Sequence, residues 1–157
     1  FPYTTLFRSV YGLDKSGNYS ILHHAFVCGP GRTTPIGTFR TPFKAAWHPL
    51  QGCWGQYCTQ ITGNYLFHSS PYNSPNKNDL SYRLYNQLGT VCSHGCVRLT
   101  VADAKWIYDN CPLGTTVSIY NASSLPVPKP SAPWLDISSP NRGWDPTDPD
   151  PANPWNK

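Results

Sequence analysis

The sequence contains no methionine and no glutamate, so all eight of its acidic residues are aspartate. Charged residues make up only 13% of its 157 residues, and the formal net charge is +4 at pH 7. There is no run of Lys and Arg and no basic stripe, so we expect no nucleic-acid partner. There is also no run of about 18 apolar residues, and the sequence therefore predicts no transmembrane segment.

A cofactor motif is missing as well. The stretch 29–35 is rich in glycine, but it lacks the Gly-Lys-Ser/Thr ending of a phosphate-binding loop and no helix pattern follows it. We therefore discard phosphate binding there and predict that the protein uses no cofactor.

Proline is unevenly distributed, because nine of the 17 prolines follow Tyr120. Residues 1–120 carry nine Lys and Arg against four Asp, a net charge of +5, whereas residues 121–157 carry three against four, a net charge of −1. The sequence thus predicts a domain over residues 1–120 and a Pro-, Trp- and Asp-rich extension over residues 121–157. This extension is either a disordered spacer or an ordered wrap that docks through Trp134, Trp144 and Trp155.

Side chains with catalytic chemistry are most concentrated in the segment Thr90-Val-Cys-Ser-His-Gly-Cys-Val-Arg-Leu99. A cysteine becomes a usable nucleophile where a cation, an imidazole or free backbone N–H groups favour its thiolate, and Cys96 has His94 and Arg98 within two residues. The pair Thr100 and Asp103 then forms a helix-start signal, and an apolar stripe follows until about residue 110. Cys96 is therefore expected on a tight loop just before a helix, where unpaired N–H groups favour negative charge.

These residues carry a resemblance. The run Ser93-His-Gly-Cys-Val-Arg98 resembles the signature of the L,D-transpeptidase (YkuD-type) catalytic domain, and the runs Thr34–Phe39 and Leu66–Ser69 are similar to two further segments of that family. The similarity covers roughly residues 10–120, and residues 1–9 resemble the family least. The 24 residues between His68 and Ser93 exceed the commonest family spacing, which predicts an inserted helix or loop.

The pattern of the remaining chain is mostly β. Apolar alternation and turn signals predict a hairpin over residues 10–13 and 19–28, strands over residues 36–40, 56–62, 65–68 and 115–120, and two short helices over residues 79–88 and about 100–110. This mostly β class agrees with the β-sandwich-like fold, with two short helices, that the resemblance implies.

The hairpin that ends at His68 positions this side chain. The two-residue turn Gly63-Asn64 predicts that Thr62 faces Tyr65, that Ile61 faces Leu66 and that Thr59 faces His68. Period-two alternation puts Leu66 and His68 on one face of the sheet. His68 is thus expected at a strand end, on a defined side.

The resemblance implies a site and a reaction. Cys96 would attack a carbonyl of a peptidoglycan stem, between its third residue and D-alanine, with His68 as general base, and an amine of a second stem would take the acyl group to give a 3→3 cross-link. Partners would be stem peptides, with carbapenems as inhibitors. The supporting roles fall on the oxyanion donors of His94, Gly95 and Cys96, on Ser93 in the motif, on Ser69 as an orienting residue for His68, and on Arg98 as a holder of the thiolate or a stem carboxylate.

Three alternatives remain open. Cys92, His94, Cys96 and His68 are four ligand types that zinc accepts, although their spacing only partly matches that of zinc knuckles. An L,D-carboxypeptidase would use the same acyl-enzyme and hand it to water. A non-catalytic, disulfide-stapled cell-wall-binding module would have Cys96 bridged.

Six cysteines in a short chain indicate an oxidising compartment. If Cys96 stays a thiol, we expect a bridge between Cys92 and Cys111, which would tie the loop to the far end of the following helix, and a second between Cys53 and Cys58. The expected location is secreted or associated with a bacterial cell wall. The sequence has no initiator Met and no signal peptide, so this expectation makes the chain a mature or truncated form.

Overall fold

The computed structural model describes residues 7–120 and 130–157. Its strands are β1 (Phe7–Leu13), β2 (Tyr19–Val27), β3 (Gly37–Arg40), β4 (Lys44–Leu50), β5 (Cys53–Thr62), β6 (Tyr65–Ser69), β7 (Val97–Leu99) and β8 (Thr116–Ile119). Its helices are α1 (Tyr82–Tyr85), α2 (Val101–Asn110) and the 3-10 turn η1 (Pro154–Asn156). The predicted class, mostly β with two short helices, is confirmed.

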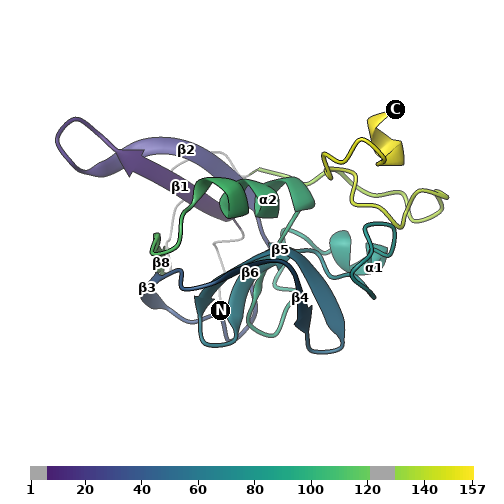
Figure 1. Cartoon of the computed structure of the whole chain (residues 1–157), viewed down its shortest axis with the longest axis horizontal. Helices are drawn as coiled ribbons and strands as arrows, with labels where there is room; N and C mark the ends of the chain where they lie inside the picture. The colour runs from purple at the N-terminus through teal and green to yellow at the C-terminus, as the bar shows by residue number, and fades with distance from the viewer. Residues whose placement is uncertain (1–6, 121–129) are drawn as a thin grey trace.

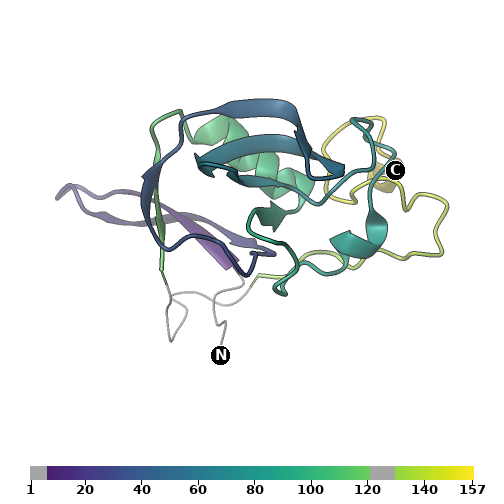
Figure 2. The same ribbon diagram turned by 90° about the horizontal axis from the view of Figure 1, so that it is seen from below.

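The largest sheet has four strands in the order β4-β5-β6-β7, and α2 lies against one of its faces (Figure 1, Figure 2). Strands β4, β5 and β6 are antiparallel neighbours, whereas β7 runs parallel to β6. A parallel neighbour needs a crossover connection, and the 27 residues between Ser69 and Val97, which include α1, supply it. The long spacing noted in the sequence is this crossover.

Two smaller sheets flank the main one. Strands β1 and β2 form the predicted hairpin, which projects beyond the body of the molecule (Figure 1), and β3 pairs with β8. His24, near the base of the hairpin, stacks on Trp106 of α2 with ring centroids 4.8 Å apart. Its Nε2 lies 3.6 Å from the carboxylate of Asp103, so the base of the hairpin is attached to α2.

Helix α2 forms where the sequence predicts it. The Thr100 side chain accepts a hydrogen bond from the Asp103 backbone N–H, which is the expected N-cap. Val101, Ala104 and Ile107 are the buried residues of the helix. The last two pack with Phe67 of β6 and other buried residues of the sheet in the larger apolar cluster.

The predicted helix over residues 79–88 is wrong in length, because only residues 82–85 are helical. Leu80 is held in an extended conformation instead, since it bridges to Tyr72 and its N–H donates to the Gly143 carbonyl at 2.8 Å. These tertiary bonds outcompete the local helical pattern. The buried side chain of α1 is consequently Tyr85.

The predicted register of the β5–β6 hairpin is only partly correct. Thr62 faces Tyr65 across the turn as predicted, but Gln60 faces Leu66 and Thr59 faces Phe67. A bulge between Gln60 and Thr62 adds one residue to β5 and shifts all later pairs.

Residues 130–157 wrap over the surface beside α1 and the start of α2 (Figure 1). Leu135 is fully buried in a second apolar cluster with Tyr72, Leu80 and Tyr85, and Trp155 packs against this cluster. The described part of the extension is therefore an ordered wrap. Its tryptophans do not all dock, because the Trp134 side chain is 78% exposed. The division at residue 120 stays a prediction, and the polyproline positions before residue 130 lie outside the described residues.

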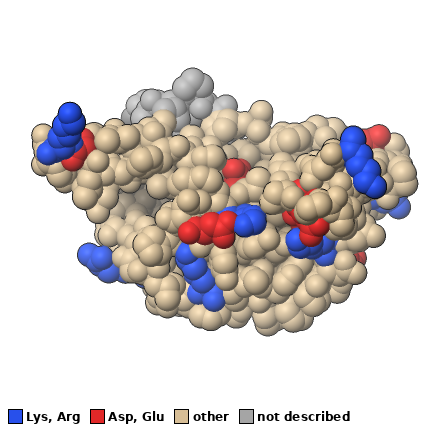
Figure 3. Space-filling view, turned by 45° about the horizontal axis from the view of Figure 1, so that its top comes forward, with Lys and Arg blue, Asp and Glu red and all other residues tan. Residues whose placement is uncertain are grey.

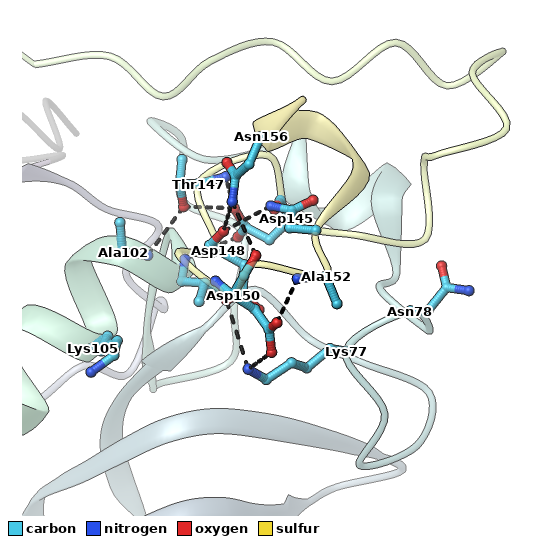
Figure 4. A network of polar contacts seen from close by, with 12 residues as sticks. Lys77, Asn78, Ala102, Lys105, Asp145, Thr147, Asp148, Asp150, Ala152 and Asn156 are labelled. Carbon is cyan, nitrogen blue, oxygen red and sulfur yellow. Dashed lines mark hydrogen bonds and ion pairs between the residues drawn. The ribbon is translucent and has the colours of Figure 1, made fainter.

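Polar groups of the wrap form a network around the start of α2 (Figure 4). One oxygen of the Asp145 carboxylate accepts from the Val101 N–H at 2.9 Å, and the Thr147 hydroxyl accepts from the Ala102 N–H at 3.1 Å. The other Asp145 oxygen accepts from the Thr147 N–H and hydroxyl. The first N–H groups of a helix have no partner inside it, so the wrap completes the capping that Thr100 begins.

Neither predicted disulfide is present, because Cys53, Cys58, Cys92 and Cys111 are all free thiols. The two thiols of the first pair have different surroundings: a Cβ on Gly29 would lie 2.3 Å from the Cys92 sulfur, whereas Cys111 caps α2 and packs in the larger apolar cluster.

The surface charge and the length of the helices do not indicate a particular partner. Charged side chains are scattered over the face shown in Figure 3, without a patch of one sign. Within the described residues, no helix is long and apolar enough to cross a membrane.

Candidate active site

The β6–β7 pair brings the two motifs together. His68 is paired with Arg98 in the parallel register, and neighbouring residues in adjacent strands point to the same face. Alternation carries this face back to Leu66 in β6 and to Cys96, two residues before Arg98. The opposite face bears Phe67, which packs in the apolar cluster with α2. One face of the pair is thus core, and the other is free for chemistry.

That free face borders a cavity that has a volume of about 570 Å³ and is open to solvent on one side. Its lining includes the sequence-predicted residues Cys96, His68, Arg98, His94, Gly95 and Ser93. None of the described lining residues is acidic. The volume falls within the range of small-molecule sites in proteins.

His68 is held as a neutral imidazole. Its side chain is almost fully buried, and its Nδ1 lies 2.5 Å from the Ser69 carbonyl oxygen. A carbonyl can only accept, so Nδ1 carries the proton and Nε2 keeps its lone pair. Burial lowers the pKa of His68 to about 4, and Arg98 adds to this decrease. The Nε2 atom is therefore free to accept a proton over the whole physiological range.

The Cys96 thiol is half-buried, and its Sγ lies 3.5 Å from the Asn64 carbonyl oxygen in the β5–β6 turn. Burial raises the pKa of Cys96, and the opposing effects of a backbone hydrogen bond at Leu66 and of Arg98 are smaller. The sequence-based expectation that neighbouring cations favour the thiolate is thus outweighed by desolvation. At neutral pH the pair is a thiol and a neutral imidazole.

The motif around Cys96 is held in place by the loop of residues 29–35. This role was not predicted from the sequence. The Thr33 N–H and hydroxyl both donate to the His94 carbonyl, and the Thr34 hydroxyl donates to the Gly95 carbonyl at 2.7 Å. In a trans peptide the N–H points opposite to the C=O, so the N–H groups of Gly95 and Cys96 point away from this loop.

Two glycines allow this contact. A Cβ on Gly31 would lie 2.1 Å from the Gly95 nitrogen, and a Cβ on Gly95 would lie 2.4 Å from the Tyr65 ring. The glycine-rich stretch 29–35 was discarded as a phosphate loop, but its glycines and threonines were the available signal for this close backbone approach.

Two serines support the motif and His68 through hydrogen bonds. The Ser93 hydroxyl donates to the Cys96 carbonyl and closes the turn around Gly95. Ser69 orients His68 through its main-chain carbonyl, while its hydroxyl accepts from the Gln56 N–H and donates to Ser70.

Arg98 and His94 differ in how firmly they are held. The guanidinium of Arg98 donates to the Cys92 carbonyl, and its Nε is buried without a partner in the described structure. His94 is exposed at the rim of the cavity.

Two further side chains in the cavity were not predicted to lie there. Cys53, at the start of β5, and His48, in β4, both line it. Burial raises the pKa of Cys53. Strand β4 was not predicted, and β5 begins three residues before the predicted strand, so neither residue could be assigned to this cavity from its pattern.

The alternative of a zinc site finds no support in the geometry. Among residues 7–120 and 130–157, no three His, Cys or Asp side chains are grouped so that they could hold a metal ion.

The chain is similar to known proteins over this same region. Residues 10–119 match the family model of the L,D-transpeptidase catalytic domain (YkuD). The putative L,D-transpeptidase YciB of Bacillus subtilis is 39% identical over 93 residues, covering 55% of this chain and 46% of that protein.

Two solved structures are also similar. A fused zinc-dependent amidase/peptidase/peptidoglycan-binding domain-containing protein of Clostridium acetobutylicum is 36% identical with a TM-score of 0.55, covering 73% of this chain and 47% of that one. An L,D-transpeptidase of Mycobacterium smegmatis has a TM-score of 0.50 at 20% identity, covering 64% and 50%, and shows the shared fold. This chain thus spans about half the length of these relatives. Because the family model matches more than half of the chain, the chain belongs to the L,D-transpeptidase (YkuD) catalytic domain family.

Proposed function

We propose that the protein is a peptidoglycan L,D-transpeptidase that forms 3→3 cross-links through a thioester at Cys96. The observation that carries this proposal is the placement of Cys96, His68 and Arg98 on one face of the β6–β7 pair, inside one cavity. Family membership supports the same reaction class.

In the first half of the reaction, Cys96 Sγ adds to the amide carbonyl between the third stem residue and D-alanine. His68 Nε2 takes the thiol proton as this bond forms, because at neutral pH both groups start uncharged. The N–H groups of Gly95 and Cys96 are the proposed donors to the developing oxyanion, each typically contributing about 3 kcal/mol. The C–N bond then breaks, and His68 returns the proton to the amine of D-alanine.

In the second half, an amine of a second stem attacks the thioester. His68 accepts the proton of this amine, the C–S bond breaks, and the sulfur is protonated again. Arg98 is the partner of His68 in the register of β6 and β7. It either stabilises the anionic sulfur of Cys96 electrostatically or binds a carboxylate of the stem. This activity places the protein at a bacterial cell wall.

The test is incubation with purified muropeptides that carry a tetrapeptide stem, followed by mass spectrometry. A cross-linked dimer that has lost one D-alanine is the expected product. Tripeptide alone would make the protein an L,D-carboxypeptidase, in which water takes the acyl group. No change in the muropeptides would favour a wall-binding module and overturn the proposal.

The same thiol should react with carbapenems, because their strained β-lactam presents an activated carbonyl to it. Intact-mass analysis should show one adduct, which peptide mapping places on Cys96. A Cys96→Ala variant that still gains the adduct would contradict the assignment.

A further inference from the structure

A second, polar hollow lies at the seam between the domain and the C-terminal wrap. It has a volume of about 350 Å³, and its walls come from residues 73–82 on one side and residues 140–143 on the other. This size is within the range of small-ligand sites. Neither the motifs nor the proposed chemistry accounts for it.

The walls of this seam hollow are fixed by one bond between them and by one bond within the wall of residues 73–82. The Leu80 N–H donates to the Gly143 carbonyl at 2.8 Å, and the Asn73 N–H donates to the Asp79 carbonyl at 3.0 Å. A Cβ on Gly143 would lie 2.6 Å from the carbonyl oxygen of Asn78, so the two segments touch there.

The wall of residues 73–82 is also attached to the wrap by an ion pair. Lys77 Nζ lies 2.6 Å from the Asp150 carboxylate of the wrap, whereas Asn78 points away from this network (Figure 4). The hollow is therefore formed before any ligand arrives.

The chemistry of the lining suits a neutral, hydroxyl-rich ligand. Its charged residues are one cation, Arg142, and one carboxylate, Asp79, so their charges sum to zero. The Asp79 oxygens already accept from Asn73 and Ser74, and the Arg142 guanidinium lies over the Tyr82 ring at 5.1 Å. Amide side chains both donate and accept hydrogen bonds, which matches hydroxyl and acetamido groups better than phosphates or dicarboxylates.

The position of the hollow relates it to the active-site cavity. Pro71 lines the cavity and Asn73 lines the hollow, and the residue between them, Tyr72, is fully buried and bridges to both Trp54 and Leu80. Two residues of extended chain span about 7 Å, so the hollow begins close to one end of the cavity. An extended three-residue stem spans about 10 Å, so the sugar that carries a stem must be held away from the attacked carbonyl.

We propose that the seam hollow binds an N-acetylated sugar of the glycan strand whose stem enters the active-site cavity. This inference rests on the proposed function, since it assigns the second part of the same substrate. The wrap thereby supplies one wall of a substrate site.

The experiment compares two donors, a free tetrapeptide and the same tetrapeptide on its disaccharide, for the wild type and for the double variant Asn78→Ala, Arg142→Ala. The expected result is a KM for the disaccharide donor that rises about tenfold, or about 1.4 kcal/mol, with kcat and all constants for the free tetrapeptide unchanged. The matched control, Asn18→Ala with Arg83→Ala, removes the same groups from the exposed hairpin turn and from α1 and should change neither donor.

A binding measurement separates this inference from the proposed reaction. Calorimetric titration with the β-1,4-linked tetramer of N-acetylglucosamine, which carries no peptide, should show binding to the wild type and to Cys96→Ala but not to the double variant. Equal changes for both donors, or tetramer binding that survives the double substitution, would overturn the assignment of the hollow. Tetramer binding by a protein that turns over neither donor would instead overturn the proposed reaction and leave the hollow assigned.

Discussion

The side chains of the active-site cavity and the Asp145 carboxylate of the C-terminal wrap are held by opposite hydrogen-bonding arrangements. In the cavity, main-chain carbonyls accept from side chains: Ser69 from His68, Cys92 from Arg98 and Cys96 from Ser93. In the wrap, carboxylates accept from main-chain N–H groups, as Asp145 does from Val101 and Thr147.

The two regions differ in whether their side chains keep an atom that is available for reaction. In the cavity, each side chain is oriented through one polar group, so the lone pair of His68 Nε2 and the sulfur of Cys96 remain available for reaction. In the wrap, both Asp145 oxygens are bonded, so its carboxylate stabilises structure and has no capacity for chemistry. Four tests probe this comparison.

Replacing Cys96 should have the largest effect. Cys96→Ala is expected to lower turnover to below about a thousandth of the wild-type value, because it removes the proposed nucleophile. Thermal unfolding should be nearly unchanged, since the thiol is half-buried and lies outside the apolar clusters. The matched control is Cys53→Ala, which removes a second thiol of the same cavity and should keep most activity. Turnover retained in Cys96→Ala would end the assignment.

Replacing Asp145 should act on stability. Asp145→Ala leaves the Val101 N–H and two donors of Thr147 without their acceptor in a buried place, which should cost about 2 kcal/mol of unfolding free energy. The control is Asp136→Ala, an exposed aspartate of the wrap that accepts only from Ser138, and it should cost much less unfolding free energy than Asp145→Ala. Equal costs in urea denaturation would remove the distinction between the buried network and the exposed turn.

The two regions should also respond to pH with opposite signs. Burial raises the pKa of Asp145 to about 6, so between about pH 6 and its unfolded value of 3.8 the folded state holds a proton that the unfolded state lacks, and stability rises as pH falls. The pKa of His68 is lowered to about 4 from 6.5, so between these values the unfolded state holds the extra proton, and stability falls as pH falls.

Single substitutions measure separately how Asp145 and His68 change the pH dependence of the unfolding free energy. Between pH 6 and 4, Asp145→Asn should lose stability on acidification and His68→Gln should gain it, each by up to about 1.4 kcal/mol per pH unit relative to the wild type. Guanidinium denaturation at each pH measures the slopes. Slopes of the same sign in both variants would contradict the assignment of opposite protonation states.

The smallest expected effects concern two lysines. Lys77→Met breaks the contact with Asp150 and leaves the fully buried Asp148 side chain, 3.9 Å away, without its cation, which should cost about 1 kcal/mol. Lys105→Met breaks a half-exposed pair with Asp109 one turn along α2 and should cost about 0.3 kcal/mol. A larger cost for Lys105→Met would show that the wrap network does not depend on Lys77.

The parts of the site that were predictable are local. The Gly63-Asn64 turn, the Thr100 cap of α2 and the motif around Cys96 depend on residues within a few positions of one another. One error lies in the same hairpin as a correct prediction, and the others involve distant partners. The bulge after Gln60 shifted the register, and tertiary bonds to Leu80 shortened α1. The expected Cys92–Cys111 disulfide is absent, because Cys92 lies beside Gly29 and Cys111 packs in the larger apolar cluster.

The sequence by itself determined which groups can react and which elements carry them, since a histidine at a strand end and a cysteine before a helix cap are set by short-range geometry. Only the tertiary structure decided that β6 and β7 run parallel, which places His68 beside Arg98 and both on the face of Cys96. It also decided the protonation state of the pair, because the pKa of a buried group depends on desolvation by residues far away in the chain. The wrap belongs to the same category: Asp145 caps a helix that begins 44 residues earlier, and no local pattern encodes that distance.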